Sequence, residues 1–253
     1  MANQVYSRSA LRSGITVQPG QSTSFTVEAL TIVAVYDAEG GPQIAHDDGY
    51  GRMKEPTESG EYVIVGSWKH VSTRQWAFSR IEWGSPLREQ NGIVEVSVSG
   101  IWHPLTQYCQ VTKAEIVSWY NLNYGKNELP KTWVLNDFGH ITCFIAKDLN
   151  HDGKWNKDSE KIHHQFFHTT PEDEAASFMG KEVPLGESHG CIHVKPHDID
   201  EMITKDYMKQ GNMVYIHDYN TNPLGPTTPE QAHSPYSLHF FPGINKLFIK
   251  GHK

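Results

Sequence analysis

Side chains that can take part in covalent chemistry are concentrated in residues 186–193, which read Gly-Glu-Ser-His-Gly-Cys-Ile-His. A cysteine becomes a nucleophile as its thiolate, which requires a nearby base or positive charge. His189 lies two residues before Cys191, and His168 can reach the same place through folding. Gly190 has no Cβ, so a substrate carbonyl can approach the backbone closely, and N–H groups of this segment are candidate donors to an oxyanion. The residues therefore predict a cysteine acyl-transfer site.

The same residues resemble a known family. Ser-His-Gly-Cys at residues 188–191, with His168 upstream, is similar to the signature of the L,D-transpeptidase catalytic domain, also called the YkuD domain. Residues 55–62, Glu-Pro-Thr-Glu-Ser-Gly-Glu-Tyr, resemble the Pro-Thr-x-x-Gly-x-Phe/Tyr turn that precedes a strand in this family. Residues 196–210 read as a helix and residues 211–216 as a closing strand, which is a third similarity.

The resemblance covers residues 30–217 and includes two departures. Nineteen residues, 169–187, separate His168 from Ser188, which is a longer spacer than the family usually has and leaves room for a larger lid. His193 stands where the family usually has an arginine. If His193 takes over the carboxylate contact of that arginine, it does so only while protonated.

The resemblance also implies a reaction. Cys191 would attack the L,D peptide bond between diaminopimelate and the terminal D-Ala of a peptidoglycan stem tetrapeptide, forming a thioester. His168 would be the base, oriented by the backbone carbonyl of Thr169, and the N–H groups of Gly190 and Cys191 would bind the oxyanion. A second stem, a D-amino acid or water would resolve the thioester by 3–3 cross-linking, exchange or L,D-carboxypeptidation, and no cofactor is required. The other expected site residues, which shape the loop or contact the substrate, are Ser188, His189, His193, Trp83 and Phe167.

The expected fold is mainly β, a β-rich α+β protein with a YkuD-like sandwich or barrel, a few short helices and a C-terminal extension. Residues 1–28 are expected to form an N-terminal extension with the first strands, residues 29–218 the catalytic domain, and residues 219–253 a linker and a C-terminal strap. Apolar and β-branched runs predict strands at residues 15–17, 24–27, 31–36, 61–65, 92–98, 132–135, 140–146 and 211–216. Helices are expected after Thr112, after Thr170 and after Pro196, from their capping hydroxyls and prolines.

An acidic loop follows the predicted strand at residues 140–146. Side chains with oxygen atoms occupy every second position at residues 148, 150 and 152 and are followed by Gly153, as in an EF-hand or dockerin calcium loop. Ser159 occupies the twelfth position instead of the closing glutamate, so the alternative is a solvated hairpin. The candidate calcium ligands are Asp148, Asn150, Asp152, Asn156 and Asp158.

Composition limits the classes of partner. The chain of 253 residues has 22 basic and 29 acidic residues, a net charge of −7 that disfavours nucleic acid or an anionic membrane as partner. No segment is long enough to span a bilayer, and no signal peptide is recognisable, so export by a leaderless route is one hypothesis for a protein acting in the periplasm or cell wall.

Three functional classes stay open at this point. A transpeptidase that maintains the cell wall and an antibacterial effector with an immunity or secretion partner would share the chemistry. A catalytically inactive cell-wall-binding module is the third. A His/Cys metal-binding protein is a further alternative, although the spacing matches no recognised zinc pattern.

Overall fold

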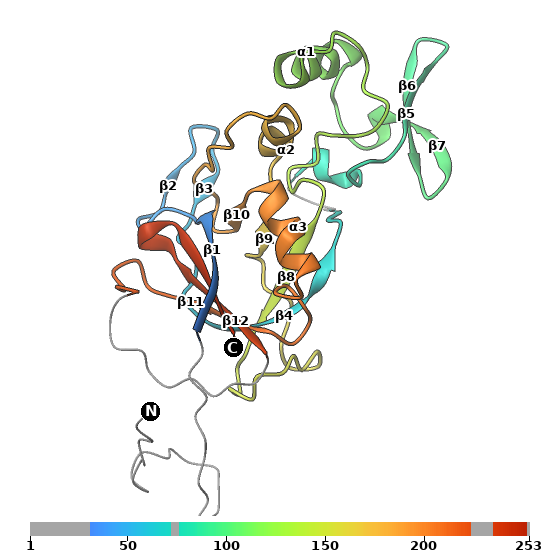
Figure 1. Cartoon of the computed structure of the whole chain (residues 1–253). Helices are drawn as coiled ribbons and strands as arrows, with labels where there is room; N and C mark the ends of the chain where they lie inside the picture. Colours follow the sequence, from blue (N-terminus) through green and yellow to red (C-terminus); the bar gives the residue numbers. More distant parts are fainter. Residues whose placement is uncertain (1–30, 72–75, 224–234, 252–253) are drawn as a thin grey trace, which may run out of the picture.

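A closed barrel forms the body of the molecule (Figure 1). This computed structural model describes residues 31–71, 76–223 and 235–251. Strand neighbours follow the order β1-β10-β9-β8-β4-β11-β12-β13, and β13 pairs with β1 to close the barrel. The barrel strands are β1 (Thr31–Glu39), β4 (Gly60–Trp68), β8 (Thr142–Lys147), β9 (Phe167–His168), β10 (Ile192–Val194), β11 (Met213–Ile216), β12 (Tyr236–Phe241) and β13 (Lys246–Gly251). The expected mainly β fold is confirmed, while the strands expected at residues 15–17 and 24–27 lie outside the described residues.

The barrel core is built from alternate residues of these strands, because successive strand side chains point to opposite faces. Tyr62 and Ile64 of β4, Ile145 of β8, Phe167 of β9 and Ile192 of β10 are all fully buried in it. The predicted β-branched and aromatic runs therefore form the inner surface of the barrel. Both strands that carry the candidate chemistry belong to this rigid wall.

The segment expected to be a C-terminal strap is part of the barrel. β12 pairs in parallel with β11, and β13 pairs antiparallel with both β12 and β1. Leu238, Phe240, Leu247 and Ile249 from these two strands are fully buried in the core. Removing residues 236–251 would therefore open the barrel and expose its core.

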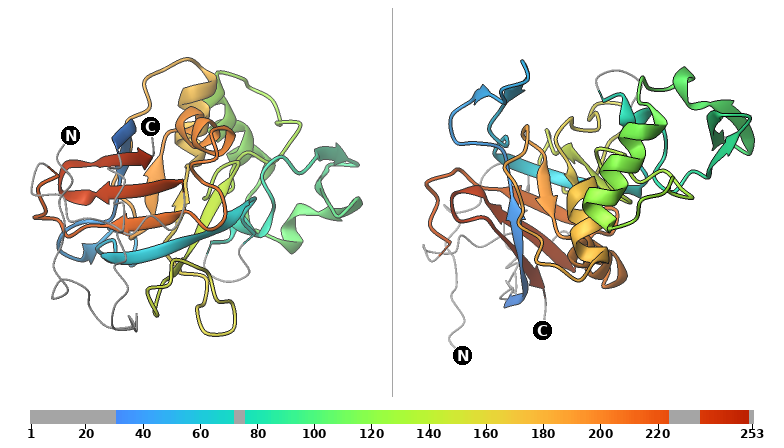
Figure 2. Two further views of the ribbon diagram at one scale, coloured as in Figure 1. Left: turned by 60° about the horizontal axis from the view of Figure 1, so that its bottom comes forward. Right: turned by 90° about the horizontal axis from the view of Figure 1, so that it is seen from above.

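A lobe formed by residues 76–135 stands out from one end of the barrel (Figures 1 and 2). Ile81, Leu105, Ile116 and Trp133 are buried in a separate apolar core of this lobe. Its elements are η2 (Phe78–Arg80), β5 (Leu87–Gln90), β6 (Ile93–Val98), β7 (Ile101–Pro104), η3 (Leu105–Gln107) and α1 (Lys113–Tyr124). The lobe thus has its own three-stranded sheet and helix between β4 and β8 of the barrel.

Two predictions made for this lobe have different outcomes. The capping box is confirmed: the Thr112 hydroxyl accepts from the Glu115 N–H, and the Glu115 carboxylate accepts from the Thr112 N–H. The strand expected at residues 132–135 is wrong, since only an isolated bridge joins Thr132 to Pro86. Its apolar residues instead serve the lobe core, where Trp133 is completely buried.

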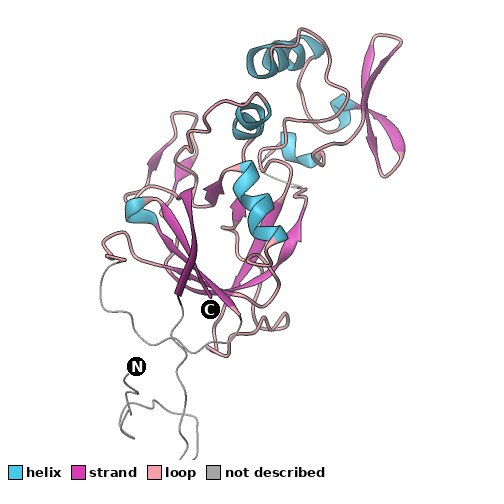
Figure 3. Cartoon of the chain, in the orientation of Figure 1, coloured by secondary structure: helices cyan, strands magenta, loops and turns pink. Residues whose placement is uncertain are grey.

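A short hairpin and two short helices lie near the strands β9 and β10 (Figures 1 and 3). A hairpin of β2 (His46–Asp47) and β3 (Met53–Lys54), residues 46–54, is called the flap below. The helix α2 (Pro171–Phe178) begins at Thr170, whose hydroxyl accepts from the Asp173 N–H. The helix α3 (Pro196–Thr204) is shorter than expected, because Asp206 adopts a left-handed conformation with φ of 60° just after it.

A last short helix is η4 (Pro242–Ile244). In the described part of the chain, no helix combines the length and apolarity needed to cross a membrane.

Candidate active site

The candidate site lies on the outer face of the paired strands β9 and β10. These strands are parallel, with Ile192 opposite Phe167 and His193 opposite His168. Ile192 and Phe167 point into the barrel core, so their neighbours His193 and His168 point outward, where their rings are 4.7 Å apart. Cys191 precedes His193 by two residues and falls on the same outward side. Pairing of the two short strands therefore places the cysteine and the histidine identified in the sequence on one face of the sheet.

An apolar aromatic cluster surrounds the two residues. Cys191 packs against the cluster that includes the buried rings of Phe138 and Phe166. The His168 ring contacts the same two rings, with centroid separations of 4.9 Å and 5.7 Å. The thiol and the imidazole thus contact one aromatic cluster, in which His168 is buried and Cys191 is half-buried.

His168 is held in one tautomer. Its side chain is buried, and Nδ1 lies 2.6 Å from the backbone oxygen of Thr169, so Nδ1 carries the proton and Nε2 is left as the acceptor. Desolvation lowers the pKa of His168 well below its usual value. The charges of His193 and His70 lower this pKa further, whereas the hydrogen bond to the Thr169 carbonyl raises it. His168 is therefore a neutral imidazole at pH 7. The contact expected between His168 and the carbonyl that follows it is present.

Cys191 is a protonated thiol in this environment. Its side chain is half-buried, and Sγ lies 3.9 Å from the backbone oxygen of His164. Burial raises the pKa of Cys191 to about 12, and a hydrogen bond with the Phe166 backbone opposes this only weakly. The resting pair is therefore a neutral thiol and a neutral imidazole. The sulfur must lose its proton as it attacks, which requires a base within reach.

The loop that carries the thiol, residues 186–193, is called the catalytic loop below. Ser188 Oγ donates to the backbone oxygen of Cys191 at 2.5 Å and accepts from the Gly190 N–H at 2.9 Å. Gly190 has φ of 111°, and a Cβ at this position would lie 2.2 Å from Nε2 of Gln165. Only glycine fits both constraints. Because the Gly190 N–H is bonded inside the loop, the Cys191 N–H is the better candidate oxyanion donor of the two expected from the sequence.

Gln165 joins the catalytic loop to the turn at residues 55–62. Its Nε2 donates to the Pro56 carbonyl at 3.0 Å, and its Oε1 accepts from the Glu58 N–H at 2.8 Å. The side chain is buried and packs directly against Gly190. This contact explains why two segments so distant in sequence both belong to the site. The sequence offered no signal for Gln165 beyond its position next to the strand that carries His168.

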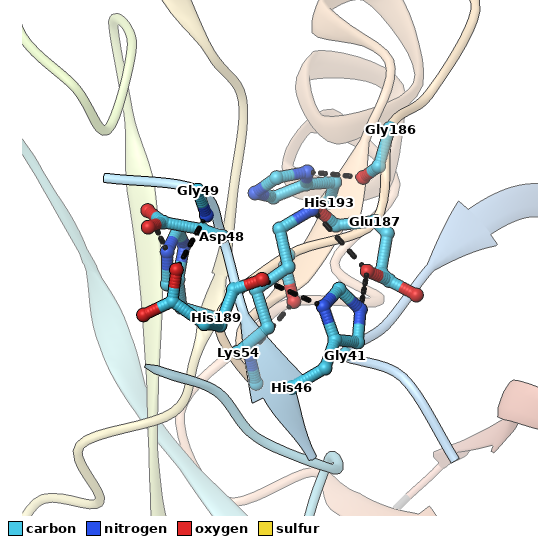
Figure 4. A network of polar contacts seen from close by, with 12 residues as sticks. Gly41, His46, Asp48, Gly49, Lys54, Gly186, Glu187, His189 and His193 are labelled. Carbon is cyan, nitrogen blue, oxygen red and sulfur yellow. Dashed lines mark hydrogen bonds and ion pairs between the residues drawn. The ribbon is translucent and has the colours of Figure 1, made fainter. Parts of the chain in front are cut away.

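The flap contacts the catalytic loop through polar side chains (Figure 4). Asp48 Oδ2 lies 3.0 Å from Nε2 of His189. Lys54 donates to the backbone oxygen of Glu187 at 3.0 Å, and His46 Nε2 lies 2.8 Å from Glu187 Oε1. Three flap residues thus hold two loop residues that flank Ser188. None of the flap partners was identified from the sequence, because their contacts depend on folding across more than 130 residues.

Asp48 is the ionised centre of the flap contact. Its desolvation is outweighed by hydrogen bonds from the N–H groups of Tyr50 and Arg52 and from His189, which lower the pKa of Asp48 to about 2. The Arg52 guanidinium lies 4.5 Å from the ring centre of Trp76, and Trp76 meets the His189 ring edge-on at 5.5 Å. His189 is therefore committed to flap contacts, which supports a loop-shaping role for it.

His193 is not the cation expected from its position. Its Nδ1 lies 2.8 Å from the backbone oxygen of Gly186, so this nitrogen is a donor. Desolvation lowers the pKa of His193 to about 4; the Gly186 carbonyl opposes this, and the charges of His189 and Lys54 add to it. His193 is therefore neutral at pH 7 and contacts the catalytic base edge-on. Burial and nearby positive charges disfavour the protonated form of His193 in the free protein, and its contact with a substrate carboxylate stays a prediction.

The two aromatic residues expected to contact substrate lie elsewhere. Phe167 is fully buried in the barrel core. Trp83 lies in the turn after η2, where its carbonyl accepts from Lys69 Nζ at 2.9 Å, and none of its described contacts joins it to the catalytic loop. His70, which the sequence analysis missed, contacts Phe138 and Phe166 with ring separations of 4.1 Å and 5.3 Å. Burial lowers the pKa of His70 to about 4, so it is a second neutral imidazole in the aromatic cluster.

Two buried carboxylates of the acidic loop at residues 148–160 accept hydrogen bonds from backbone N–H groups of the same loop. The buried Asp148 carboxylate accepts from Asp152 and Gly153, at 3.2 Å and 2.9 Å. The buried Glu160 carboxylate accepts from Leu149 and Asn156, at 2.9 Å and 2.8 Å. Glu160, which was not among the candidate calcium ligands, thus ties the two ends of the loop together. Asn150 donates to Asp152 at 3.1 Å, and calcium binding by this loop stays a prediction.

Side chains that could share one metal ion are gathered elsewhere. Among the described residues, those with ligand atoms close enough together to hold one metal ion are His197, Asp198 and Glu201 of α3. The histidines of the catalytic loop and Cys191 are absent from that group. In the part of the chain that the structure describes, the catalytic loop therefore has no group of side chains that supports the metal-binding alternative.

Comparison with known proteins identifies the family of the chain. The family model for the L,D-transpeptidase catalytic domain, YkuD, matches residues 34–216. Neither the curated proteins nor the solved structures gave a match. The matched span begins within β1 and ends with β11, includes His168 and the whole catalytic loop, and exceeds half of the chain. The chain therefore belongs to the L,D-transpeptidase catalytic domain family.

Proposed function

We propose that this protein is a cysteine acyltransferase that acts on the L,D peptide bond of peptidoglycan stem tetrapeptides. Family membership supports peptidoglycan modification in general. The observation that carries the finer assignment is the tautomer of His168. Its Nδ1 proton is bonded to Thr169, so Nε2 is available as a base on the face that it shares with Cys191.

The proposed first half-reaction forms a thioester. Nε2 of His168 takes the thiol proton as Sγ of Cys191 attacks the carbonyl carbon, and the Cys191 N–H stabilises the resulting oxyanion. The tetrahedral intermediate collapses with cleavage of the carbon–nitrogen bond. The leaving D-Ala amine takes the proton from His168, which leaves a neutral base and an acyl-enzyme.

The second half-reaction restores the thiol. An acceptor amine or water attacks the thioester carbonyl and gives its proton to His168, and this proton returns to sulfur as the carbon–sulfur bond breaks. A stem-peptide acceptor gives a 3–3 cross-link, a D-amino acid gives exchange, and water gives L,D-carboxypeptidation. Every step uses groups of the chain and the substrates, so no cofactor takes part.

The proposed place of action is the cell wall or periplasm, where stem peptides occur. A housekeeping transpeptidase and an antibacterial effector would use the same site. An immunity protein that inhibits this chain, encoded beside it, would identify the effector.

Muropeptide analysis tests the proposed reaction. The purified protein is incubated with tetrapeptide muropeptides, alone and with a D-amino acid, and the products are analysed by mass spectrometry. We expect loss of D-Ala, exchange or 3–3 dimers from the wild type and none of these from Cys191→Ala. Cys109→Ala is the matched control, because this buried thiol lies in the core of the lobe and leaves the site unchanged. Equal conversion by folded Cys191→Ala would refute the proposal.

A further inference from the structure

One carboxylate behind the base joins three parts of the chain. Glu174 on α2 accepts at Oε1 from the Thr169 hydroxyl, from the His140 N–H at 3.1 Å and from His140 Nδ1 at 2.5 Å. His140 lies just before β8, and Thr169 directly follows the base His168. The group formed by Thr169, Glu174 and His140 is called the brace below.

Thr169 connects the brace to the base through its other end. Its backbone oxygen accepts from His168 Nδ1, while its side chain donates to Glu174. Thr169 is fully buried, and a Cβ added at Gly139 would lie 1.8 Å from its Oγ1 and 2.8 Å from Glu174 Oε1. The left-handed turn at Gly139, with φ of 63°, is what permits this close approach. The peptide group that orients His168 is therefore fixed by its own side chain as well as by the sheet.

The charge of Glu174 has a partner. Desolvation opposes charging of His140, but hydrogen bonds and charges of Glu174 and Asp200 prevail and raise the pKa of His140 to about 9. Asp200 lies 3.0 Å from His140 Nε2 and is mostly exposed. Glu174, the carboxylate on the side of the catalytic base, is therefore the less exposed to solvent of the two. A largely buried carboxylate is thus held as half of an ion pair at the position where it anchors Thr169.

We propose that Glu174 is a positioning residue for the catalytic base: with His140 as its counter-ion, it holds Thr169 in the place where the Thr169 carbonyl selects the Nδ1-protonated tautomer of His168. This inference rests on the proposed function for its catalytic consequence but not for its structural one. Nδ1–H must face Thr169 for Nε2 to face the thiol, and the wrong tautomer would present a donor to a donor. Motion of the Thr169 peptide would therefore lower the fraction of the protein that is competent to deprotonate Cys191.

The alternative is that Glu174 merely ties α2 to the barrel. In that case its loss would lower thermal stability and leave the His168 tautomer unchanged. The two readings differ in a property of His168 itself, so a readout at that ring decides between them.

The experiment compares variants that differ in one polar group. Thr169→Val removes the hydroxyl and keeps the shape, and Thr169→Ser restores the hydroxyl. Glu174→Gln removes the charge, and Glu172→Gln is the matched control on the same helix because Glu172 contacts Trp119 instead of the brace. Nitrogen-15 NMR of histidine-labelled protein reports the tautomer of His168, whose signals are assigned by their loss in His168→Gln. Iodoacetamide alkylation of Cys191 and muropeptide turnover are measured on the same samples.

We expect the wild type, Thr169→Ser and Glu172→Gln to show the Nδ1–H tautomer, and Thr169→Val to show a mixture of both. The kcat of Thr169→Val should fall about 10- to 100-fold with KM changed by less than about 2-fold, because misplacement of a catalytic group by about 1 Å can cost about 100-fold in rate. Glu174→Gln should also show a mixture of tautomers and a lower kcat. Both changes should be smaller than in Thr169→Val, since the amide oxygen of Gln can still accept from the Thr169 hydroxyl.

An unchanged His168 tautomer in folded Thr169→Val and Glu174→Gln would overturn the inference. If the wild type does not convert muropeptides, the proposed function fails, while the tautomer and the alkylation rates still decide whether Glu174 positions the base. If Thr169→Val does not fold, Glu174→Gln against Glu172→Gln carries the test.

Discussion

The front and the rear of the catalytic loop are held by different kinds of contact. At the front, the flap reaches Glu187 through ion pairs whose side chains are 50% exposed at His46, 35% at Glu187 and 22% at Lys54, whereas its contact with His189 is made by Asp48, which is 5% exposed. At the rear, Thr169 is fully buried and the Glu174 side chain is 11% exposed. Exposed ion pairs contribute little to stability and break readily, whereas a buried polar group left without its partner is costly. We therefore expect the contacts of the flap with Glu187 to break more readily than the contacts that hold Thr169.

The two histidines that precede the thiol in sequence, His168 and His189, make the same point. His168 belongs to the rear, with its ring buried and bonded to a backbone carbonyl. His189 belongs to the front, where its ring contacts Asp48 of the flap and the edge of Trp76. A base needs a fixed tautomer and a lone pair that faces the nucleophile, and the contacts of His168 meet that need.

The largest effect is expected from removing the rear histidine. His168→Ala should reduce turnover by about 100- to 10,000-fold, the usual contribution of a general base, whereas His189→Ala should reduce it far less. Alkylation of Cys191 against pH checks the assignment independently of substrate. Because the pKa of Cys191 is raised to about 12, wild-type alkylation should still be rising at the most alkaline pH that the fold tolerates. If His189→Ala alone raised the apparent thiol pKa, the roles of the two histidines would be reversed.

A smaller effect is expected from loosening the flap. Lys54→Met removes a charge that contacts Glu187 and should raise KM a few-fold with little change in kcat, because the flap would then lie less often over a bound peptide. Lys69→Met is the matched control, since Lys69 pairs with Glu82 on the lobe, away from the catalytic loop. Steady-state kinetics with a muropeptide substrate checks this. A fall in kcat as large as that of a brace variant would mean that front and rear are not distinct.

Thermal stability should have a maximum near neutral pH. His70, His168 and His193 have folded-state pKa values below 6.5, so the unfolded chain binds more protons and stability is lost as pH falls from about 6.5 toward 4. His140 has a raised pKa of about 9, so its contribution is complete below about 6.5 and is lost as pH rises through 9. Melting temperatures between pH 4 and 10 measure both limbs. His140→Gln should flatten the alkaline limb alone, and an unchanged alkaline limb in that variant would contradict the charged state of His140.

The smallest effect is expected at His193. Since the pKa of His193 is lowered to about 4, a neutral side chain that still donates to Gly186 should replace it with little cost. His193→Gln should therefore keep the shape of the pH–rate profile above pH 5 and change the rate by less than a few-fold. Loss of an alkaline limb in this variant alone would show that His193 acts as a cation after all.

The sequence by itself determined the features that depend on short-range patterns. The Ser-His-Gly-Cys segment with an upstream histidine, the capping box at Thr112 and Glu115, and four of the eight barrel strands, β1, β4, β8 and β11, follow from residues close together in the chain. These patterns were sufficient for the family and for the mainly β fold. The strand expected at residues 132–135 failed because an apolar run of that length serves equally well as a buried loop, with Trp133 in the lobe core.

Tertiary structure alone decided the protonation and the partners of the site residues. A pKa depends on burial and on charges from distant segments, so nothing local to His193 indicates that it is neutral. Contacts of Glu174 with His140 and of Lys54 with Glu187 join segments separated by 34 and 133 residues. The closed barrel brings these segments together, because pairing of β9 with β10 and of β13 with β1 fixes which side chains can meet.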